Sequence, residues 1–231
     1  MSRILMMVSG ADAMTLADGS SHPTGFWAEE LAVPHRTFCQ AGVDVDIATP
    51  GGGAPTPDPI SLDSEMVDDE EAEQYRAYLD DIASDLQAPL KLADVRVTDY
   101  DAVFVPGGHG PMEDLVDDED AGRVLREADE SGLPIAVLCH GPAALLAATD
   151  DGGFRFAGRR LATFSDEEEQ QGGLGDACPW FLETRLREQG AQPQVGEPWG
   201  PQVVEDGNLL SGQNPASSAE LAERVLAVLE G

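Results

Sequence analysis

One cysteine stands where its neighbours in the sequence favour a reactive thiol. Cys139 ends the apolar run IAVLC (135–139), and His140 and the helix-forming stretch GPAALLAA follow it directly. Pro142 suits the first turn of such a helix, where a missing N–H costs nothing. A helix N-terminus favours thiolate and lowers the pKa of a cysteine, and His140 adds an imidazole. We therefore predict that Cys139 is a nucleophile rather than a small buried apolar residue.

A second candidate for substrate contact follows another apolar run, AVFVPGG (102–108). Gly107 and Gly108 let the backbone approach a ligand closely and present N–H groups, as an oxyanion hole requires. Adjacent parallel strands end at one edge of a sheet, where open α/β sheets bind ligands. We therefore predict that Gly107, Gly108 and the backbone of His140 contact the substrate near the thiol.

The elements that must position these residues are strands that alternate with helices. The apolar runs are residues 3–9, 45–49, 102–108 and 135–139. Residues 27–41 have apolar positions at helical spacing, so they form one βαβ unit with the first two runs. This alternation predicts an α/β fold around a mostly parallel sheet. The 231 residues are enough for one domain, 1–231.

The segment 51–96 interrupts this alternation. It is rich in proline, glycine and aspartate, and it then has a helical stretch with Tyr75 and Leu79. Because it is too short to form a core of its own, we predict a small inserted flap. Further along, the sequence predicts a strand at 159–164, a loop at 165–176, a helix at 180–189, a hairpin with an Asp-Gly turn at 206–207, and an amphipathic helix at the C-terminus.

Charge is the most unusual property of the chain. It has 44 acidic against 13 basic side chains and a formal net charge of -31, and Lys91 is its one lysine. Such a surface repels nucleic acids and anionic membranes, so we predict neither as a partner. We hypothesise a salt-filled cytoplasm, where ions at molar concentration screen self-repulsion. A melting temperature that does not rise between low salt and molar KCl would contradict this hypothesis.

The cysteine content argues against a disulfide framework. Cys39, Cys139 and Cys178 are odd in number and have unrelated spacings, which also argues against a zinc ribbon. The N-terminal apolar run is too short for a signal peptide, and no stretch approaches the roughly 18 apolar residues that span a bilayer. We therefore predict a cytoplasmic protein. Cys39 and Cys178 have no basic neighbour in this interpretation and are predicted to be structural.

Five motifs in one order resemble the ThiJ/PfpI superfamily, and they span nearly the whole chain. They are TGFWAEE (24–30), PGGHGPMEDL (106–115), AVLCHGPAALL (136–146), TFSDEEE (163–169) and GQNPASS (212–218). Within the superfamily they are similar to the branch of heat-inducible chaperones that includes glutathione-independent glyoxalase III. The resemblance implies a flavodoxin-like three-layer sandwich, a strained turn at the nucleophile and a homodimer.

The resemblance also assigns further catalytic residues. The helix-borne acid of the family falls on Glu30, and the histidine beside the nucleophile falls on His140. The acid that orients this histidine falls on Glu169, with Glu168 as the alternative because the glutamates are consecutive. Ionising two acidic groups in one buried site costs much free energy, so Glu30 and Cys139 are expected to share one proton.

The implied reaction converts methylglyoxal to lactate. Cys139 would attack the aldehyde, His140 or Glu30 would move a proton from C1 to C2, and water would release lactate. No metal, nucleotide or other cofactor is expected. Alternatives are a deglycase, amidase or peptidase with the same thiolate, or a holding chaperone that binds unfolded proteins and uses Cys139 as an oxidation sensor. A glutaminase is disfavoured. Glutamine amidotransferases with this type of sandwich have their catalytic histidine late in the chain, in an H-x-E pattern, and no histidine follows His140 here.

Other polar and aromatic residues are interpreted as structural. His109 and Glu113 are predicted to be a solvated loop pair rather than metal ligands, and His35 a surface or packing residue. Trp180 and Trp199 are candidate pocket walls, although core positions are favoured. The sequence contains no G-x-S-x-G, Walker A or G-x-G-x-x-G motif, so serine hydrolase and nucleotide-binding functions have no support.

Overall fold

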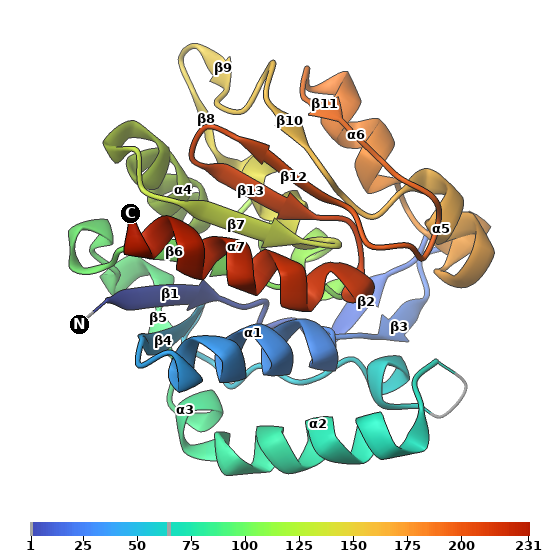
Figure 1. The fold of residues 1–231 in the computed structure, drawn as a ribbon. Coiled ribbons are helices and arrows are strands. Elements are labelled where there is room, and N and C mark those ends of the chain that lie inside the picture. Colours follow the sequence, from blue (N-terminus) through green and yellow to red (C-terminus); the bar gives the residue numbers. More distant parts are fainter. Residues whose placement is uncertain (1, 64–65) are drawn as a thin grey trace.

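The computed structural model, which describes residues 2–63 and 66–231, has a seven-stranded sheet with helices on both faces (Figure 1). The strand order is β12-β13-β7-β6-β1-β4-β5, and every neighbouring pair is parallel except β12–β13. This is the predicted α/β fold with a mostly parallel sheet. The strands are β1 (Arg3–Met7), β4 (Asp44–Thr49), β5 (Leu90–Lys91), β6 (Ala102–Val105), β7 (Ile135–Leu138), β12 (Val203–Asp206) and β13 (Leu209–Gly212).

Helices cover the two faces of the sheet in separate layers. The helices α1 and α7 pack against each other on one face, and α4 and the 3₁₀ helix η5 pack together on the other. Asp118 caps α4 by accepting a hydrogen bond from the Ala121 N–H at 2.7 Å, and Gly132 ends it in the left-handed conformation. The bounds are α1 (Ala28–Gln40), α4 (Glu119–Ser131), η5 (Gly141–Ala147) and α7 (Ser218–Glu230).

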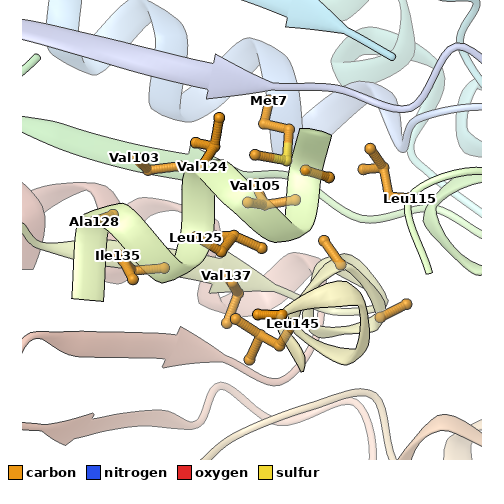
Figure 2. Packing of buried hydrophobic residues seen from close by; sticks show 14 of the residues in the cluster. Met7, Val103, Val105, Leu115, Val124, Leu125, Ala128, Ile135, Val137 and Leu145 are labelled. Carbon is orange, nitrogen blue, oxygen red and sulfur yellow. The ribbon is translucent and has the colours of Figure 1, made fainter. Parts of the chain in front are cut away.

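Alternate residues of the central strands face opposite layers. On β6, Val103 and Val105 belong to the apolar cluster under α4, whereas Ala102 and Phe104 belong to the cluster under α1 and α7. Figure 2 shows the α4 side, where Val103 and Val105 belong to one packed cluster with Val124 and Leu125 of α4. Because both faces are buried, these strands appear in the sequence as continuous apolar runs.

The segment 51–96 adds a further layer outside α1. Its helix α2 (Asp69–Asp81) packs on α1 and buries Tyr75 and Leu79 in the same apolar cluster as Phe38 of α1. A short helix, α3 (Ala83–Gln87), then leads to β5, which pairs with β4 at the edge of the sheet. The segment therefore shares the core of the main fold.

Two local predictions are wrong. The segment predicted as a loop at 165–176 begins with a helix, α5 (Asp166–Gly172), because Ser165 and Glu168 form a capping box. The chain after Cys139 forms the 3₁₀ helix η5 rather than the predicted α-helix. A 3₁₀ helix is tighter and has poorer hydrogen-bond geometry than an α-helix.

The remaining elements are short and flank the sheet. The run predicted as a strand at 159–164 contributes only β10, which pairs with β11 outside the central sheet. The predicted helix at 180–189 and the Asp-Gly hairpin are confirmed as α6 and β12–β13. In the described ranges, no helix is both long enough and apolar enough to cross a membrane. The bounds are β2 (Ala13–Thr15), β3 (Ser21–Pro23), β8 (Thr149–Asp150), β9 (Gly153–Phe154), β10 (Arg160–Leu161), β11 (Gln192–Pro193) and α6 (Leu182–Glu188).

Candidate active site

Cys139 lies directly after β7, beside the glycine turn that follows the neighbouring strand β6. Its backbone φ is 58°, in the left-handed region that residues other than glycine rarely adopt. Its side chain is buried, with 3% of the residue exposed. Strained backbone of this kind concentrates at functional sites. The strained turn implied by the resemblance is therefore present at the carboxyl edge of the sheet.

His140 and Glu169 join Cys139 in one hydrogen-bonded chain. Nδ1 of His140 lies 3.3 Å from Sγ of Cys139, and Nε2 lies 2.9 Å from Oε2 of Glu169. A carboxylate can only accept a hydrogen bond, so Nε2 carries the imidazole proton and Nδ1 is free to accept one from the thiol. The three side chains have the arrangement of a nucleophile, a base and an acid that orients the base.

The environment keeps His140 in the state that a base requires. Burial raises the pKa of Glu169, but hydrogen bonds from His109 and His140 outweigh burial and hold this pKa far below its usual range. Burial and the neighbouring His109 lower the pKa of His140, against the opposing effect of Glu169. The pair at neutral pH is therefore a carboxylate and a neutral imidazole.

Glu30 is the second group that bears on the thiol. It is fully buried on α1, and its Oε2 accepts a hydrogen bond from the Gly107 N–H at 2.8 Å. Its Oε1 has no hydrogen-bond partner of ordinary geometry in the described ranges. Burial raises the pKa of Glu30 to about 8, although the interactions of its carboxyl group with the Cys139 thiol and the Gly107 N–H act to lower this pKa. Glu30 is therefore protonated at neutral pH.

The pKa of Cys139 differs from the sequence prediction. Burial and the charge of Glu30 raise it well above its usual range, against the opposing N–H of Gly108. The predicted lowering by a helix N-terminus is wrong, because burial of the sulfur and the neighbouring Glu30 carboxyl group raise the pKa. Cys139 and Glu30 therefore each hold a proton at neutral pH, and the expectation that they share one proton is wrong. The thiol needs a base at the moment of attack, and the Nδ1 of His140 is in place.

The glycine turn supplies one of its two predicted N–H groups. The Gly108 N–H interacts with the Cys139 sulfur, whereas the Gly107 N–H donates to Glu30 and is not available to a substrate. The role predicted for Gly107 is therefore wrong. Gly108 has a φ of +84°, and a Cβ there would lie 2.4 Å from the carbonyl oxygen of Gly25. Only glycine fits this position.

His109 belongs to the site, although the sequence interpretation placed it in solvent. Its Nε2 lies 3.2 Å from both carboxylate oxygens of Glu169, and its ring centroid is 4.1 Å from that of His140. The predicted pair with Glu113 is wrong, because Glu113 accepts a hydrogen bond from the Thr15 N–H at 3.0 Å. The available signal was the position of His109 directly after the two glycines.

A small cavity lies beside the thiol. Its volume is about 30 Å³, and Cys139, His109, His140, Phe164 and Trp199 are among its lining residues. Trp199 has a φ of 63° and packs edge-on against Phe164, with centroids 5.7 Å apart, so it is a pocket wall. A cavity needs a volume of roughly 10 to 15 Å³ to hold one water molecule, so this cavity can hold only a very small molecule.

Glu168 supports the pocket rather than the base. It is fully buried, and it accepts hydrogen bonds from side chains and backbone of three segments around the site. Glu169, not Glu168, reaches His140, which decides between the two consecutive glutamates. The donors to Glu168 are Ser165, Trp199, Gln213 and Asn214.

The other two cysteines have no activated thiol. Cys39 does have a basic neighbour, contrary to prediction, because His35 lies one turn earlier on α1 with Nδ1 3.6 Å from the sulfur. Burial and nearby aspartates nevertheless raise the pKa of Cys39. Burial raises the pKa of Cys178 to about 12, and its sulfur donates to the Trp180 carbonyl at 3.1 Å. All three cysteines are free.

Comparison with known proteins gives consistent matches over almost the full chain. The sequence model of the DJ-1/PfpI family matches residues 22–228. The protein/nucleic acid deglycase HchA of Staphylococcus aureus is 30% identical over 233 residues, which cover 96% of this chain and 77% of that protein.

Solved structures match equally broadly. Rapid Encystment Protein 24 kDa of Francisella tularensis is 29% identical with a TM-score of 0.88, and the match covers 99% of both chains. Glyoxalase III of Candida albicans has the same fold, with a TM-score of 0.83 at 24% identity, covering 98% of this chain and 96% of that chain.

Proposed function

Because the chain belongs to the DJ-1/PfpI family, we propose that it is a cysteine enzyme that acts on reactive carbonyl compounds. We propose further that it is a glutathione-independent glyoxalase that converts methylglyoxal to lactate. The observation that carries this proposal is the placement of the Cys139 thiol between the His140 base and the protonated Glu30, beside a cavity of about 30 Å³. A cavity of this size suits a three-carbon dicarbonyl better than a bulky adduct.

The first step forms a hemithioacetal. Sγ of Cys139 attacks the aldehyde carbon C1, and the thiol proton passes to Nδ1 of His140, 3.3 Å away. Glu30 gives its proton to the aldehyde oxygen O1. The N–H groups of Gly108 and His140 stabilise the charge that develops on O1. This step leaves an imidazolium at His140 and a carboxylate at Glu30.

The second step moves hydrogen between the two carbons. The Glu30 carboxylate removes the proton from C1, and the His140 imidazolium protonates O2, which gives an enediol. Glu30 then returns its proton to C2, and His140 takes the proton from O1. The product is a lactoyl thioester on Cys139, with His140 again charged and Glu30 again ionised.

Hydrolysis completes the cycle. Water attacks the thioester carbon as the Glu30 carboxylate accepts a water proton, and His140 returns its proton to the departing sulfur. Lactic acid leaves and ionises in solvent. The thiol, the neutral imidazole and the protonated Glu30 are restored, so each group ends in its starting state.

The second candidate is a deglycase, which the name of the Staphylococcus aureus relative favours. The same thiol would attack a carbonyl adduct on a protein or nucleotide. Nucleic acid was not expected as a partner of so acidic a chain, and the name of that relative weighs weakly against this expectation. The homodimer, the salt-filled cytoplasm and the chaperone role stay predictions.

The test measures lactate formation from methylglyoxal without glutathione, in molar KCl. We expect turnover by the wild type and by Cys178→Ala, and a fall of at least about a thousandfold for Cys139→Ala, because the nucleophile is lost. Cys178 is the matched control, since it is a buried cysteine outside the site. Equal lactate production by the wild type and Cys139→Ala would refute the proposal.

A companion assay separates the two candidates. Methylglyoxal adducts of N-acetylarginine release free methylglyoxal spontaneously. A glyoxalase consumes only the free compound, so the adduct disappears no faster than it dissociates. A deglycase acts on the adduct itself, so the adduct disappears faster than that. We expect adduct loss at the spontaneous rate. Faster loss, together with little turnover of free methylglyoxal, would assign the deglycase reaction instead.

A further inference from the structure

We propose that His109, His140 and Glu169 bind one divalent transition-metal ion, and that the bound ion stops the thiol chemistry at Cys139. The binding is independent of the proposed reaction, whereas the inhibition rests on the proposed function. The metal is not a participant in the catalytic cycle above. It competes with that cycle for the same imidazole.

The donor atoms are of the kinds that zinc binds, and both nitrogen–oxygen separations are close to those of a zinc site. Two imidazole nitrogens and one carboxylate oxygen all lie within 4.8 Å of one another. Nε2 of His140 is 2.9 Å, and Nε2 of His109 is 3.2 Å, from Glu169 oxygens. Ligand atoms around a tetrahedral zinc ion with bonds of 2.0–2.1 Å are about 3.3 Å apart. The present nitrogen–oxygen distances are therefore close to those of a formed site.

The three ligands are held in place by the fold. His109 follows β6, His140 follows β7 and Glu169 lies on α5, and their side chains are 12%, 2% and 3% exposed. The Leu174 N–H donates to Glu169 Oε1 at 2.6 Å and orients the carboxylate. Although the chain is rich in acidic residues, no other three potential ligands gather so closely in the described ranges.

The ion would keep an open coordination position. His109 and His140 both line the cavity of about 30 Å³ beside Cys139, which has room for a water bound to the ion. Three protein ligands with one open position suit zinc, cobalt or another divalent transition ion. Magnesium and calcium prefer oxygen ligands, so neither fits this donor set.

Metal binding removes the base that the thiol needs. Without metal, Nε2–H of His140 donates to Glu169, and Nδ1 can accept the thiol proton. A metal ion takes the Nε2 lone pair, so the single imidazole proton moves to Nδ1. No proton is gained or lost by the ring, but Nδ1 no longer accepts one. Glu30, the other group beside the thiol, is protonated at the start of the proposed cycle, so Cys139 then has no free base.

The binding test is a calorimetric titration of Zn²⁺ in molar KCl with excess Mg²⁺, which occupies the surface carboxylates. We expect one tightly bound ion per chain in the wild type, Cys139→Ala and His22→Asn. We expect at least about a hundredfold weaker binding in His109→Asn, which loses a ligand. His22 is the control histidine, on β3 outside the site. Absence of saturable binding, unchanged binding in His109→Asn, or loss of binding in Cys139→Ala would overturn the site.

A spectrum of the wild type with Co²⁺ tests the ligands without any substitution. We expect the visible bands of a nitrogen- and oxygen-ligated ion, and an intense near-ultraviolet band of sulfur ligation would contradict the proposal. Zinc should inhibit lactate formation at the concentration at which it binds. Binding without inhibition would refute the second half of the proposal. A wild type that makes no lactate would refute the proposed function and leave the calorimetric result standing.

Discussion

Replacing Glu30 with glutamine should remove a large pH dependence from the stability of the protein. Glu30 is fully buried, and its pKa is raised from an ordinary 4.5 to about 8 by burial. The folded chain therefore keeps this proton up to about pH 8, whereas the unfolded chain loses it near pH 4.5. Glutamine accepts the Gly107 hydrogen bond equally well but has no proton to lose.

The sign and the size follow from linkage. Between pH 4.5 and pH 8 the folded state binds more protons than the unfolded state, so the free energy of unfolding falls as pH rises. One group contributes at most about 1.4 kcal/mol per pH unit, and these two pKa values give a loss of roughly 3 to 4 kcal/mol between pH 5 and pH 8. The Glu30→Gln variant should lack this loss.

Urea unfolding in molar KCl at pH 5, 6, 7 and 8 measures the difference. We expect the wild type to lose stability relative to Glu30→Gln as pH rises, with most of the change between pH 5 and pH 8. Glu167→Gln, at an exposed position on α5, is the control and should follow the wild type. A constant difference between the wild type and Glu30→Gln at all four pH values would refute the reasoning.

Three further substitutions test the surroundings of the thiol. Glu168→Ala should lower the free energy of unfolding, measured by urea denaturation, by roughly 3 to 5 kcal/mol, because several buried donors lose their acceptor. A loss as small as that of Glu167→Ala would contradict the supporting role of Glu168. Trp199→Ala should raise kcat/KM for phenylglyoxal relative to methylglyoxal by about tenfold, because the pocket wall is removed; an unchanged ratio would show that Trp199 does not limit substrate size. Gly108→Ala should lower the melting temperature more than Gly132→Ala. Both glycines have a positive φ, but only at Gly108 does other backbone lie within 3 Å of the added Cβ. Equal losses would show that this close contact does not matter for stability.

The sheet could be predicted because its strands are buried on both faces. Runs such as 102–108 and 135–139 are continuously apolar, and they became β6 and β7. The helix α5 was missed, although Ser165 and Glu168 have the spacing of a capping box. Its run of acidic residues indicated a solvated loop, and the buried partners of that run are distant in sequence.

The site was predictable where neighbours in sequence are neighbours in space. Cys139 and His140 are adjacent, whereas His109 meets Glu169 across 60 residues, so no local pattern indicated their contact. The raised pKa of Cys139 depends on Glu30, which approaches from another helix. The residues next to Cys139 in the sequence indicate a turn and a helix, but they do not reveal the burial that dominates the pKa of the thiol.

The central claim is that Cys139 carries the substrate as a thioester, and rapid acid quenching during turnover tests it most directly. Peptide mass spectrometry of the quenched wild type should find a lactoyl group on the Cys139 peptide, removable by hydroxylamine, and none on the Cys178 peptide. Steady lactate formation with no adduct on Cys139, and with Cys139→Ala equally active, would contradict the claim.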